Sequence, residues 1–269
     1  MIWHHFFQIT SATQAYHFTR ILVLVFFWIQ TLEYQSLKPL WCGRKSIWNE
    51  KILSFDLQKF PLWSRSFFQL VMKDENFLSL FYMRYILGIL GLFWISPWLD
   101  GFFFFSTWLF SFRWRGTFNG GSDFMGLILT GALFVLSFSP NHSTLLRAGL
   151  AYIAVQSITS YFIAGLVKIK NQGWRTGTAL RDFFLAPPLP APLWMQKWIH
   201  KDFIIHVLAW SVLIFELSFP LIFIFPQWKI FYILTAFLFH LGNFYFFRLN
   251  RFVWAWLATY PAILYLLPS

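Results

Sequence analysis

The chain has 269 residues, of which 58% are hydrophobic and only 12% are charged, and its mean hydropathy is +0.57. This composition excludes an ordinary soluble domain, and the 37 Phe and 16 Trp residues are typical of rings that face lipid and headgroups. A net charge of +11 would suggest a nucleic-acid partner in a soluble protein, but the sequence holds no nucleic-acid-binding motif. In a membrane protein the same excess indicates basic loops and contact with anionic lipids. The single cysteine, Cys42, excludes an internal disulfide and a multi-cysteine metal site.

Apolar runs extend along the whole chain and predict one all-α polytopic transmembrane bundle over residues 1–269. A bilayer core of about 30 Å needs about 20 residues of helix. About eight candidate spans lie near 18–35, 77–97, 98–113, 122–139, 147–168, 203–225, 229–246 and 251–267. The second and third are joined through Pro97 with almost no loop, so the third could instead be a short or re-entrant helix buried against protein.

The ends and connections of these spans predict a topology. Residues 1–19 hold no basic n-region and no small-residue cleavage site, so we expect the first span to be retained as an anchor. With eight spans, most Lys and Arg residues fall in the first, third, fifth and seventh connections. The positive-inside rule then predicts that these connections are cytoplasmic and that both termini lie outside.

Two connecting segments have a composition of their own. Residues 45–75 mix Trp, Phe and Leu with Lys and Arg, and Pro61 divides them. This pattern predicts one or two amphipathic helices in the plane of the membrane interface, with a partner-binding helix as the alternative. Residues 186–193, APPLPAPL, predict an extended proline-rich connector.

Polar residues inside the apolar segments are the candidate functional residues, because each must find a partner there. Lys168 stands at the end of a long apolar run, where its charged amine is costly to desolvate. Glu216 lies well inside the predicted span 203–225. His240 and Asn243 lie three residues apart, on one face of the next helix.

Each of these residues also has a purely structural interpretation. Lys168 could extend to the headgroups, and His240 could bridge helices through hydrogen bonds. Glu216 is expected to be protonated or paired, with His206 or His240 as its partner. A zinc site from these three residues has neither an HExxH motif nor paired cysteines to support it, so no metal site is predicted. Asp123, after Asn119-Gly-Gly, is interpreted as a helix N-cap.

Four blocks of sequence carry a family resemblance through their order and spacing. The first is the close pair of spans with Leu90-Gly-Leu, and the second runs from Asn119-Gly-Gly-Ser-Asp123 to Phe138-Ser-Pro140. The third and most specific is Tyr161-Phe-Ile-Ala-Gly-Leu-Val-Lys168, followed by Trp174 and Gly177. The fourth is Glu216-Leu-Ser with Pro220, then Phe239-His-Leu-Gly-Asn243 and Phe252-Val-Trp-Ala-Trp-Leu-Ala. From about residue 18 onward the chain resembles the HTTM (horizontally transferred transmembrane) domain of the vitamin K-dependent gamma-carboxylase-like family.

The resemblance implies a catalytic role for Lys168. The gamma-carboxylases use a lysine at this position as the weak base that deprotonates vitamin K hydroquinone, so the implied cofactor is a quinone such as reduced vitamin K. This chemistry requires a neutral amine, which burial among apolar side chains favours. By the same resemblance Trp174, Glu216, His240 and Asn243 would line the site, and the turn at Asn119 would cap it.

The chain also departs from the carboxylases. They carry a histidine where this sequence has Gly121, and this histidine helps to keep the lysine neutral. The sequence resembles more closely the compact bacterial members, which include membrane proteins that help to mature a sporulation-delaying peptide toxin. We therefore expect an integral protein of a bacterial cell membrane that modifies or assists a small peptide. The alternative is a non-enzymatic helper or immunity-like protein that binds such a peptide.

Overall fold

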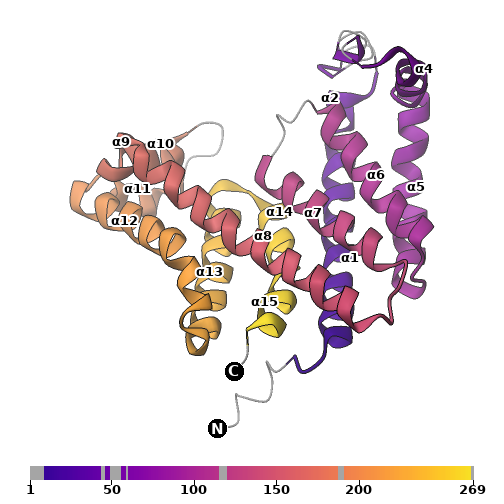
Figure 1. Cartoon of the computed structure of the whole chain (residues 1–269). Coiled ribbons are helices and arrows are strands. Elements are labelled where there is room, and N and C mark those ends of the chain that lie inside the picture. The colour runs from indigo at the N-terminus through magenta and orange to yellow at the C-terminus, as the bar shows by residue number, and fades with distance from the viewer. Residues whose placement is uncertain are drawn as a thin grey trace. The chain divides into compact units, whose positions relative to one another are not determined.

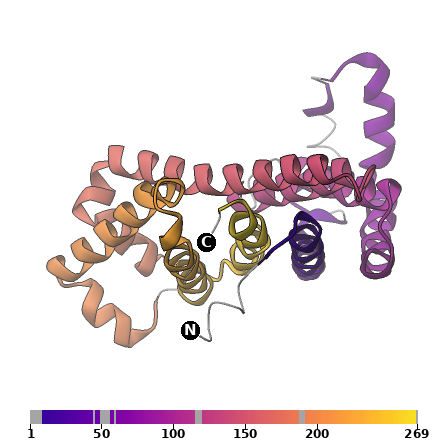
Figure 2. The same ribbon diagram turned by 60° about the horizontal axis from the view of Figure 1, so that its bottom comes forward.

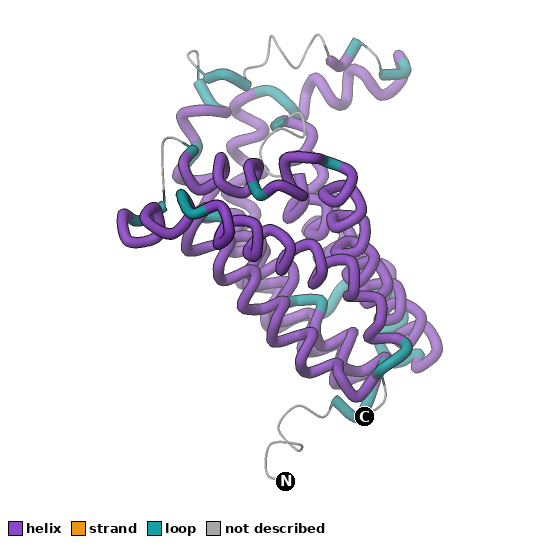
Figure 3. Tube along the Cα trace, turned by 90° about the vertical axis from the view of Figure 1, so that its left-hand side faces the viewer, coloured by secondary structure: helices purple, strands orange, loops and turns teal. Residues whose placement is uncertain are grey.

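A computed structural model describes residues 9–43, 46–48, 56–58, 60–114, 120–186 and 191–267. Within these residues the regular elements are helices and no strand occurs, which confirms the predicted all-α class (Figure 3). The chain divides into two compact units, Arg20–Gly149 and Met1–Thr19 with Leu150–Ser269. Each unit is described separately, and the single domain expected over 1–269 stays a prediction.

Five helices in the described part of the chain are long and apolar enough to cross a membrane. They are Ala12–Ser36, Asp74–Phe93, Ser143–Lys170, Asp202–Phe223 and Pro226–Phe247. The protein is therefore an integral membrane protein whose apolar helices contact lipid.

The remaining three predicted spans also fall on helices, but these helices are shorter. Residues 98–113 and 122–139 correspond to helices of 17 residues each. The segment 251–267 is divided into two helices around Thr259, where Pro261 follows in the first turn of the second helix. The count of eight spans thus stays a prediction.

The Arg20–Gly149 unit is built around a core of stacked aromatic rings. Tyr34 lies parallel to Phe110 with ring centroids 4.5 Å apart, and Trp41 meets Phe77 edge to face. Gly126 permits close packing against α1, because a Cβ there would lie 2.6 Å from the Phe26 ring. The helices of this unit, labelled in Figure 1, are α1 (Ala12–Ser36), α2 (Lys38–Trp41), α4 (Leu62–Val71), α5 (Asp74–Phe93), α6 (Pro97–Arg113) and α7 (Gly120–Leu136).

Buried arginines connect the helices of this unit. Arg20 on α1 binds both carboxylate oxygens of Asp100 on α6, at 2.5 and 2.7 Å. Arg84 on α5 is fully buried and donates to the Gln30 side-chain oxygen at 2.7 Å and to the Ser106 hydroxyl at 2.9 Å. Its guanidinium lies 3.9 Å from the centroid of the Phe27 ring. Desolvated charges of this kind hold helices together through geometry that few alternative packings can satisfy.

Burial of arginines changes which basic residues should be counted when the positive-inside rule is applied to this chain. The sequence places Arg113 and Arg251 in the basic connections and Arg20 on the opposite side, but all three are buried. Arg113 donates to the carbonyl oxygens of Met72 and Trp41 and pairs with Asp74. Such residues are held by protein partners and contribute little to loop charge. The predicted orientation of the chain therefore depends on the exposed basic residues, and it stays a prediction.

The predicted amphipathic segment 45–75 lies only partly within the described residues. Ile47 and Trp48 lie in a turn rather than a helix, and Trp48 packs on Trp114 with ring centroids 4.8 Å apart. A helix is confirmed after Pro61, where α4 begins. It exposes large apolar residues, namely Leu62, Trp63, Phe67 and Leu70. Of the connector 186–193, residues 187–190 lie outside the described residues.

The unit formed by Met1–Thr19 and Leu150–Ser269 places the C-terminal part of α8 among shorter helices. α8 is one continuous helix, seen along its length in Figure 2. The helices of this unit are α8 (Ser143–Lys170), α9 (Gln172–Thr176), α10 (Thr178–Leu185), α11 (Leu193–Ile199), α12 (Asp202–Ser218), η2 (Phe219–Phe223), η3 (Pro226–Trp228), α13 (Lys229–Phe247), α14 (Asn250–Leu257) and α15 (Tyr260–Leu266). Within it α9 and α10 pack against α12, and α13 packs against α14.

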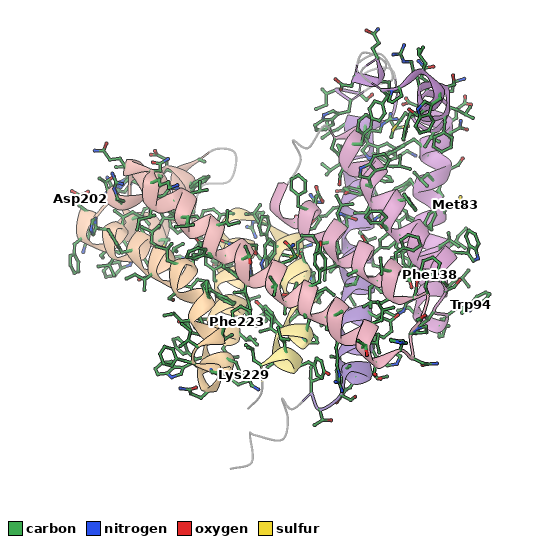
Figure 4. The ribbon with its side chains drawn as sticks, viewed as in Figure 1. Met83, Trp94, Phe138, Asp202, Phe223 and Lys229 are labelled. Atoms are coloured by element: carbon green, nitrogen blue, oxygen red, sulfur yellow. The ribbon has the colours of Figure 1, made fainter. Side chains whose placement is uncertain are left out.

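Large apolar side chains cover the outer surfaces of both units. Met83, Trp94, Phe138 and Phe223, labelled in Figure 4, are all exposed. In water such surfaces would be unfavourable, whereas in a bilayer they face acyl chains at no cost. This exposure agrees with the membrane location inferred from helix length.

Removal of the Asp100 carboxylate should destabilise the protein strongly. Asp100→Ala leaves the Arg20 guanidinium buried without its carboxylate, and the free energy of unfolding should fall by about 3–5 kcal/mol. Thermal unfolding of the purified protein in detergent measures this change. Asp202→Ala is the matched control, because Asp202 also pairs with an arginine but its side chain is 93% exposed. Equal losses in the two variants would contradict the importance of burial.

Candidate functional site

One face of α8 carries the residues that contact the other helices around the site. Ser157, Tyr161, Gly165 and Lys168 follow one another at spacings of four, four and three residues, which places them on one side of a helix. Each interacts with a different part of the unit. Ser157 shares a hydrogen bond of 2.8 Å with Thr259, between α14 and α15. The next three positions approach α13 and α12.

Lys168 and Glu216 form an ion pair at the end of this face. The Lys168 amine donates to Glu216 Oε1. The two side chains differ in burial, since that of Lys168 is 20% exposed and that of Glu216 only 2%. The structure thus pairs Glu216 with Lys168, whereas the sequence suggested His206 or His240. A carboxylate deep in the bundle explains why an amine lies at the end of an apolar helix.

Gly165 brings the two helices close enough for this pair to form. A Cβ at Gly165 would lie 3.0 Å from the backbone nitrogen of Leu217 and 3.1 Å from the Cβ of Glu216. Only hydrogen fits this space without a shift of α12. Gly165 lies one turn after Tyr161 and one turn before Lys168, so Glu216 enters the bundle between the levels of these two side chains.

Trp174 covers the amine from the following short helix. The Lys168 amine lies 5.2 Å from the centroid of the Trp174 ring, which is a cation–π geometry. Asn171 caps α9 by accepting from the Gly173 backbone at 2.8 Å. Gly177 ends the helix with φ of 80°, and a Cβ there would lie 3.1 Å from the backbone of Ile205. These caps fix the position of Trp174 relative to α12.

Tyr161 and His240 form the second polar contact of this α8 face. The Tyr161 hydroxyl lies 2.7 Å from His240 Nε2, and both side chains are buried. The Tyr161 ring stacks on Phe219 with centroids 4.2 Å apart. On the other side the His240 ring packs on Trp256 at 4.9 Å. Sequence analysis gave Tyr161 no role, although its spacing of seven residues from Lys168 could have indicated a shared face.

Two buried polar atoms of the site have no hydrogen-bond partner. Glu216 uses Oε1 for Lys168, and its Oε2 is unpartnered. His240 uses Nε2 for Tyr161, and its Nδ1 is unpartnered. Unsatisfied buried polar groups are uncommon and each calls for an explanation. A polar group of a bound molecule would supply the missing partner.

The other predicted site residues have different places. The Asn243 backbone carbonyl accepts from Arg248 and Leu249 at the end of α13, and no contact of its side chain with the pair is seen among the described residues. Asn119 lies outside the described residues. Asp123 lies within the first turn of α7 rather than at its N-cap and accepts from Gln30 at 3.1 Å. His206 packs on Trp210, and no group of three His, Cys, Asp or Glu residues suited to a metal occurs in the described part of the chain.

The pair can hold its proton in two arrangements. The Lys168 amine contacts a carboxylate and the face of an aromatic ring, which are the groups that bind an ammonium ion. The resemblance instead required a neutral amine at this position. Transfer of one proton along the hydrogen bond gives a neutral amine and a carboxylic acid without any change in net charge.

Comparison with known proteins identifies a family for the second half of the chain. Residues 141–266, which include α8 to α15, match the family model of the HTTM domain. This match confirms the HTTM resemblance over these residues, and the compact bacterial subtype stays a prediction. No curated protein and no solved structure matches the chain.

A methyl group at position 165 should open the Lys168–Glu216 pair. Gly165→Ala forces α12 away from α8, at a cost of about 1–3 kcal/mol in unfolding free energy. The Lys168 amine should then react faster with an amine-acylating reagent, which peptide mass spectrometry can measure. Gly242→Ala is the control, because a Cβ at this helical glycine meets nothing within 4 Å. Unchanged Lys168 reactivity in Gly165→Ala would show that the close approach does not hold the pair.

Proposed function

We propose that this membrane protein, which carries an HTTM domain over residues 141–266, moves a proton at the Lys168–Glu216 pair while it modifies or matures a small peptide in a bacterial cell membrane. The pair itself is the observation that supports this proposal. A lysine that only extended to the headgroups would need no carboxylate 98% buried in the bundle. Since a buried ion pair is weak evidence for stability, a chemical role gives a reason for its presence.

The proposed proton movement uses only the two side chains of the pair. The Lys168 ammonium passes a proton to Glu216, and the resulting amine takes a proton from the substrate. The pair then carries one proton more than before, and the substrate carries one fewer. Burial makes this transfer effective, because water does not compete for the proton inside the bundle.

A quinone-type lipid fits the residues beside the pair. Such a cofactor would supply redox chemistry and a ring with polar groups at its edge. The two unpartnered atoms, Glu216 Oε2 and His240 Nδ1, offer hydrogen-bonding positions for such groups. The rings of Phe215, Phe219 and Trp256 around Tyr161 provide aromatic faces for packing.

A peptide substrate would reach the pair from the end where Lys168 is exposed. Trp174 lies beside the amine at this end and offers a ring face to an apolar side chain. We propose that Asn243, one turn after His240, contributes a further polar contact, as the family resemblance implies. If the protein only bound the peptide and catalysed no reaction, Trp174 would still contact the peptide but the Lys168 amine would not be required.

Anionic lipids are proposed to bind at the α11 surface, defined by Leu193, Trp194, Lys197, Trp198 and Lys201. All five side chains are exposed. The Lys201 amine lies 4.7 Å from the centroid of the Trp198 ring. Aromatic and aliphatic side chains beside lysines suit the boundary between acyl chains and phosphate groups. Charge complementarity therefore favours phosphate-bearing headgroups here.

Loss of the Lys168 amine should abolish function while the protein still folds. Lys168→Ala removes the base, and Lys168→Arg should not restore it because a guanidinium does not deprotonate at physiological pH. Activity should fall by about 100-fold or more, as expected for loss of a general base. Complementation of a deletion strain and mass analysis of the peptide product measure the effect.

Lys170→Ala is the matched control on the same helix, because Lys170 is exposed and should be dispensable. Unfolding temperatures of the three variants establish that each is folded. A Lys168→Ala protein that complements as well as wild type would rule out the base and favour a binding protein without catalysis.

Neutralising the α11 surface should weaken the retention of anionic lipid. The double variant Lys197→Gln with Lys201→Gln should lose affinity for phosphatidylglycerol about 30-fold, since each basic residue contributes about 1 kcal/mol near a charged headgroup. Native mass spectrometry of the full chain with phosphatidylglycerol or phosphatidylcholine measures the bound lipid. The control is Lys73→Gln with Arg147→Gln, two exposed basic residues elsewhere. An equal loss in both double variants would show that net charge, rather than this surface, retains the lipid.

A further inference from the structure

α12 lies along the end of α8 and along α9, and it contacts this segment at three successive places (Figure 1). The three contacts, in order, are Lys168 with Glu216, Arg175 with Trp210, and Gly177 with Ile205. As the residue numbers rise from 168 to 177, those of their partners fall from 216 to 205. The segment and α12 therefore run antiparallel, and one helix holds both the lysine and the short helix that follows it.

The middle contact is a hydrogen bond from a tryptophan to the backbone of α9. The Trp210 indole nitrogen donates to the Arg175 carbonyl oxygen at 3.1 Å. α9 ends at Thr176, and the last carbonyls of a helix need donors from outside it. A tryptophan that only anchored the protein at the membrane surface would direct its N–H to headgroups or water. Trp210 is half-buried and uses its N–H on α9 instead.

This hydrogen bond lies next to the ring that covers the lysine. Arg175 directly follows Trp174, so the carbonyl that Trp210 binds is one residue away from the Trp174 backbone. The Trp174 ring has its centroid 5.2 Å from the Lys168 amine. A shift of the α9 backbone would therefore carry the ring away from the amine.

Two further attachments hold α9 in this place. The Arg175 side chain donates to the Ile169 carbonyl oxygen at 2.9 Å, which joins α9 to the end of α8. Gly177 lies so close to α12 that a Cβ there would be 3.1 Å from the Ile205 carbonyl oxygen. None of these attachments uses the Lys168 amine. The position of the Trp174 ring is thus set by the surrounding backbone and not by the amine that it covers.

We infer that Trp210 is a positioning residue, which anchors α9 on α12 and so holds the Trp174 ring over the Lys168 amine. α12 then supplies both partners of the amine, since Glu216 binds it directly and Trp210 acts through Trp174. A peptide that reaches the amine would pack beside this ring without displacing it. The inference rests on the proposed function, because it concerns the base of that reaction, but its test needs no activity.

The chemical reactivity of the Lys168 amine tests the anchor. Trp210→Phe keeps an aromatic ring but removes the N–H donor, so α9 and the Trp174 ring should move away from the amine. In the full chain in lipid nanodiscs, Lys168 should then be acylated about two- to fivefold faster, as expected for loss of one cation–π contact at a partly exposed site. Peptide mass spectrometry measures the rate, with the exposed Lys170 as the internal reference.

Trp228→Phe is the matched control, because Trp228 is 53% exposed and lies at the N-cap of α13. It should leave the acylation rate of Lys168 unchanged. An unchanged rate in Trp210→Phe, or an equal rise in both variants, would overturn the inference.

A double-mutant cycle separates positioning from a general loosening of the bundle. If Trp210 acts through Trp174, Trp174→Leu alone should raise the Lys168 rate by a similar factor, and adding Trp210→Phe should raise it no further. The indole signal of Trp174 in protein with 15N-labelled tryptophan, identified by its loss in Trp174→Leu, should shift in Trp210→Phe but not in Trp228→Phe. Rates that multiply in the double variant, or an unshifted Trp174 signal, would refute the positioning role.

Gly177→Ala displaces α9 by a second route and decides the question if Trp210→Phe does not fold. The added methyl group must move away from the backbone of Ile205, and φ of 80° disfavours alanine. Lys168 acylation should again be faster, and an unchanged rate would contradict the anchoring of α9. Failure of the proposed function would be seen differently, since function that survives Lys168→Ala would refute the base without changing these rates or spectra.

Discussion

Each polar side chain in this bundle must find its partner inside the protein, because acyl chains supply none. The Arg20–Asp100 pair meets this requirement with two hydrogen bonds between oppositely charged groups. Arg84 meets it with hydroxyl and amide oxygens and with the face of an aromatic ring. Polar contacts of this kind fix which helix lies beside which, since apolar surfaces alone pack in many ways. The helices around α8 are held in the same way, by polar side chains that find their partners inside the protein.

In the HTTM domain, some buried polar atoms have a hydrogen-bond partner inside the protein and others have none. The atoms without a partner distinguish the candidate site from the purely structural contacts. Ser157 and Thr259 satisfy each other, whereas Glu216 and His240 each keep one unpartnered atom. Leaving a buried polar atom unsatisfied costs about 1–3 kcal/mol. The two atoms, on α12 and α13, lie beside neighbouring turns of α8 and are the positions where we propose that the polar groups of the cofactor bind.

The sequence was sufficient to predict the long apolar helices but not the polar contacts between them. Apolar runs located the eight segments, and Lys168, Glu216 and His240 stood out as polar residues in apolar surroundings. The pairing of Lys168 with Glu216 could not be predicted, because the two residues are 48 positions apart with α9, α10 and α11 between them, and periodicity defines only a face. Gly165 decides the pairing, since its missing side chain lets α12 approach α8. The break at Thr259 was also missed, although Pro261 in the second half of that segment favours it.

The pairing changes how Lys168 would serve as the base that we propose. The carboxylases that the sequence resembles use a histidine to keep their lysine neutral, and this chain has Gly121 in place of it. In the HTTM domain described here, Glu216 is instead the group that can remove a proton from Lys168. A carboxylate and an amine joined by one hydrogen bond exchange that proton without separating charge, which is the movement that a low-dielectric interior penalises least. The basicity of Lys168 therefore depends on how a bound substrate shifts the equilibrium between the ammonium–carboxylate and the amine–carboxylic acid forms of the pair. A ligand that donates a hydrogen bond to Glu216 Oε2 weakens the hold of the carboxylate on the proton it takes from Lys168. In the proposed function, the cofactor and the base are thus linked through the two oxygens of a single carboxylate.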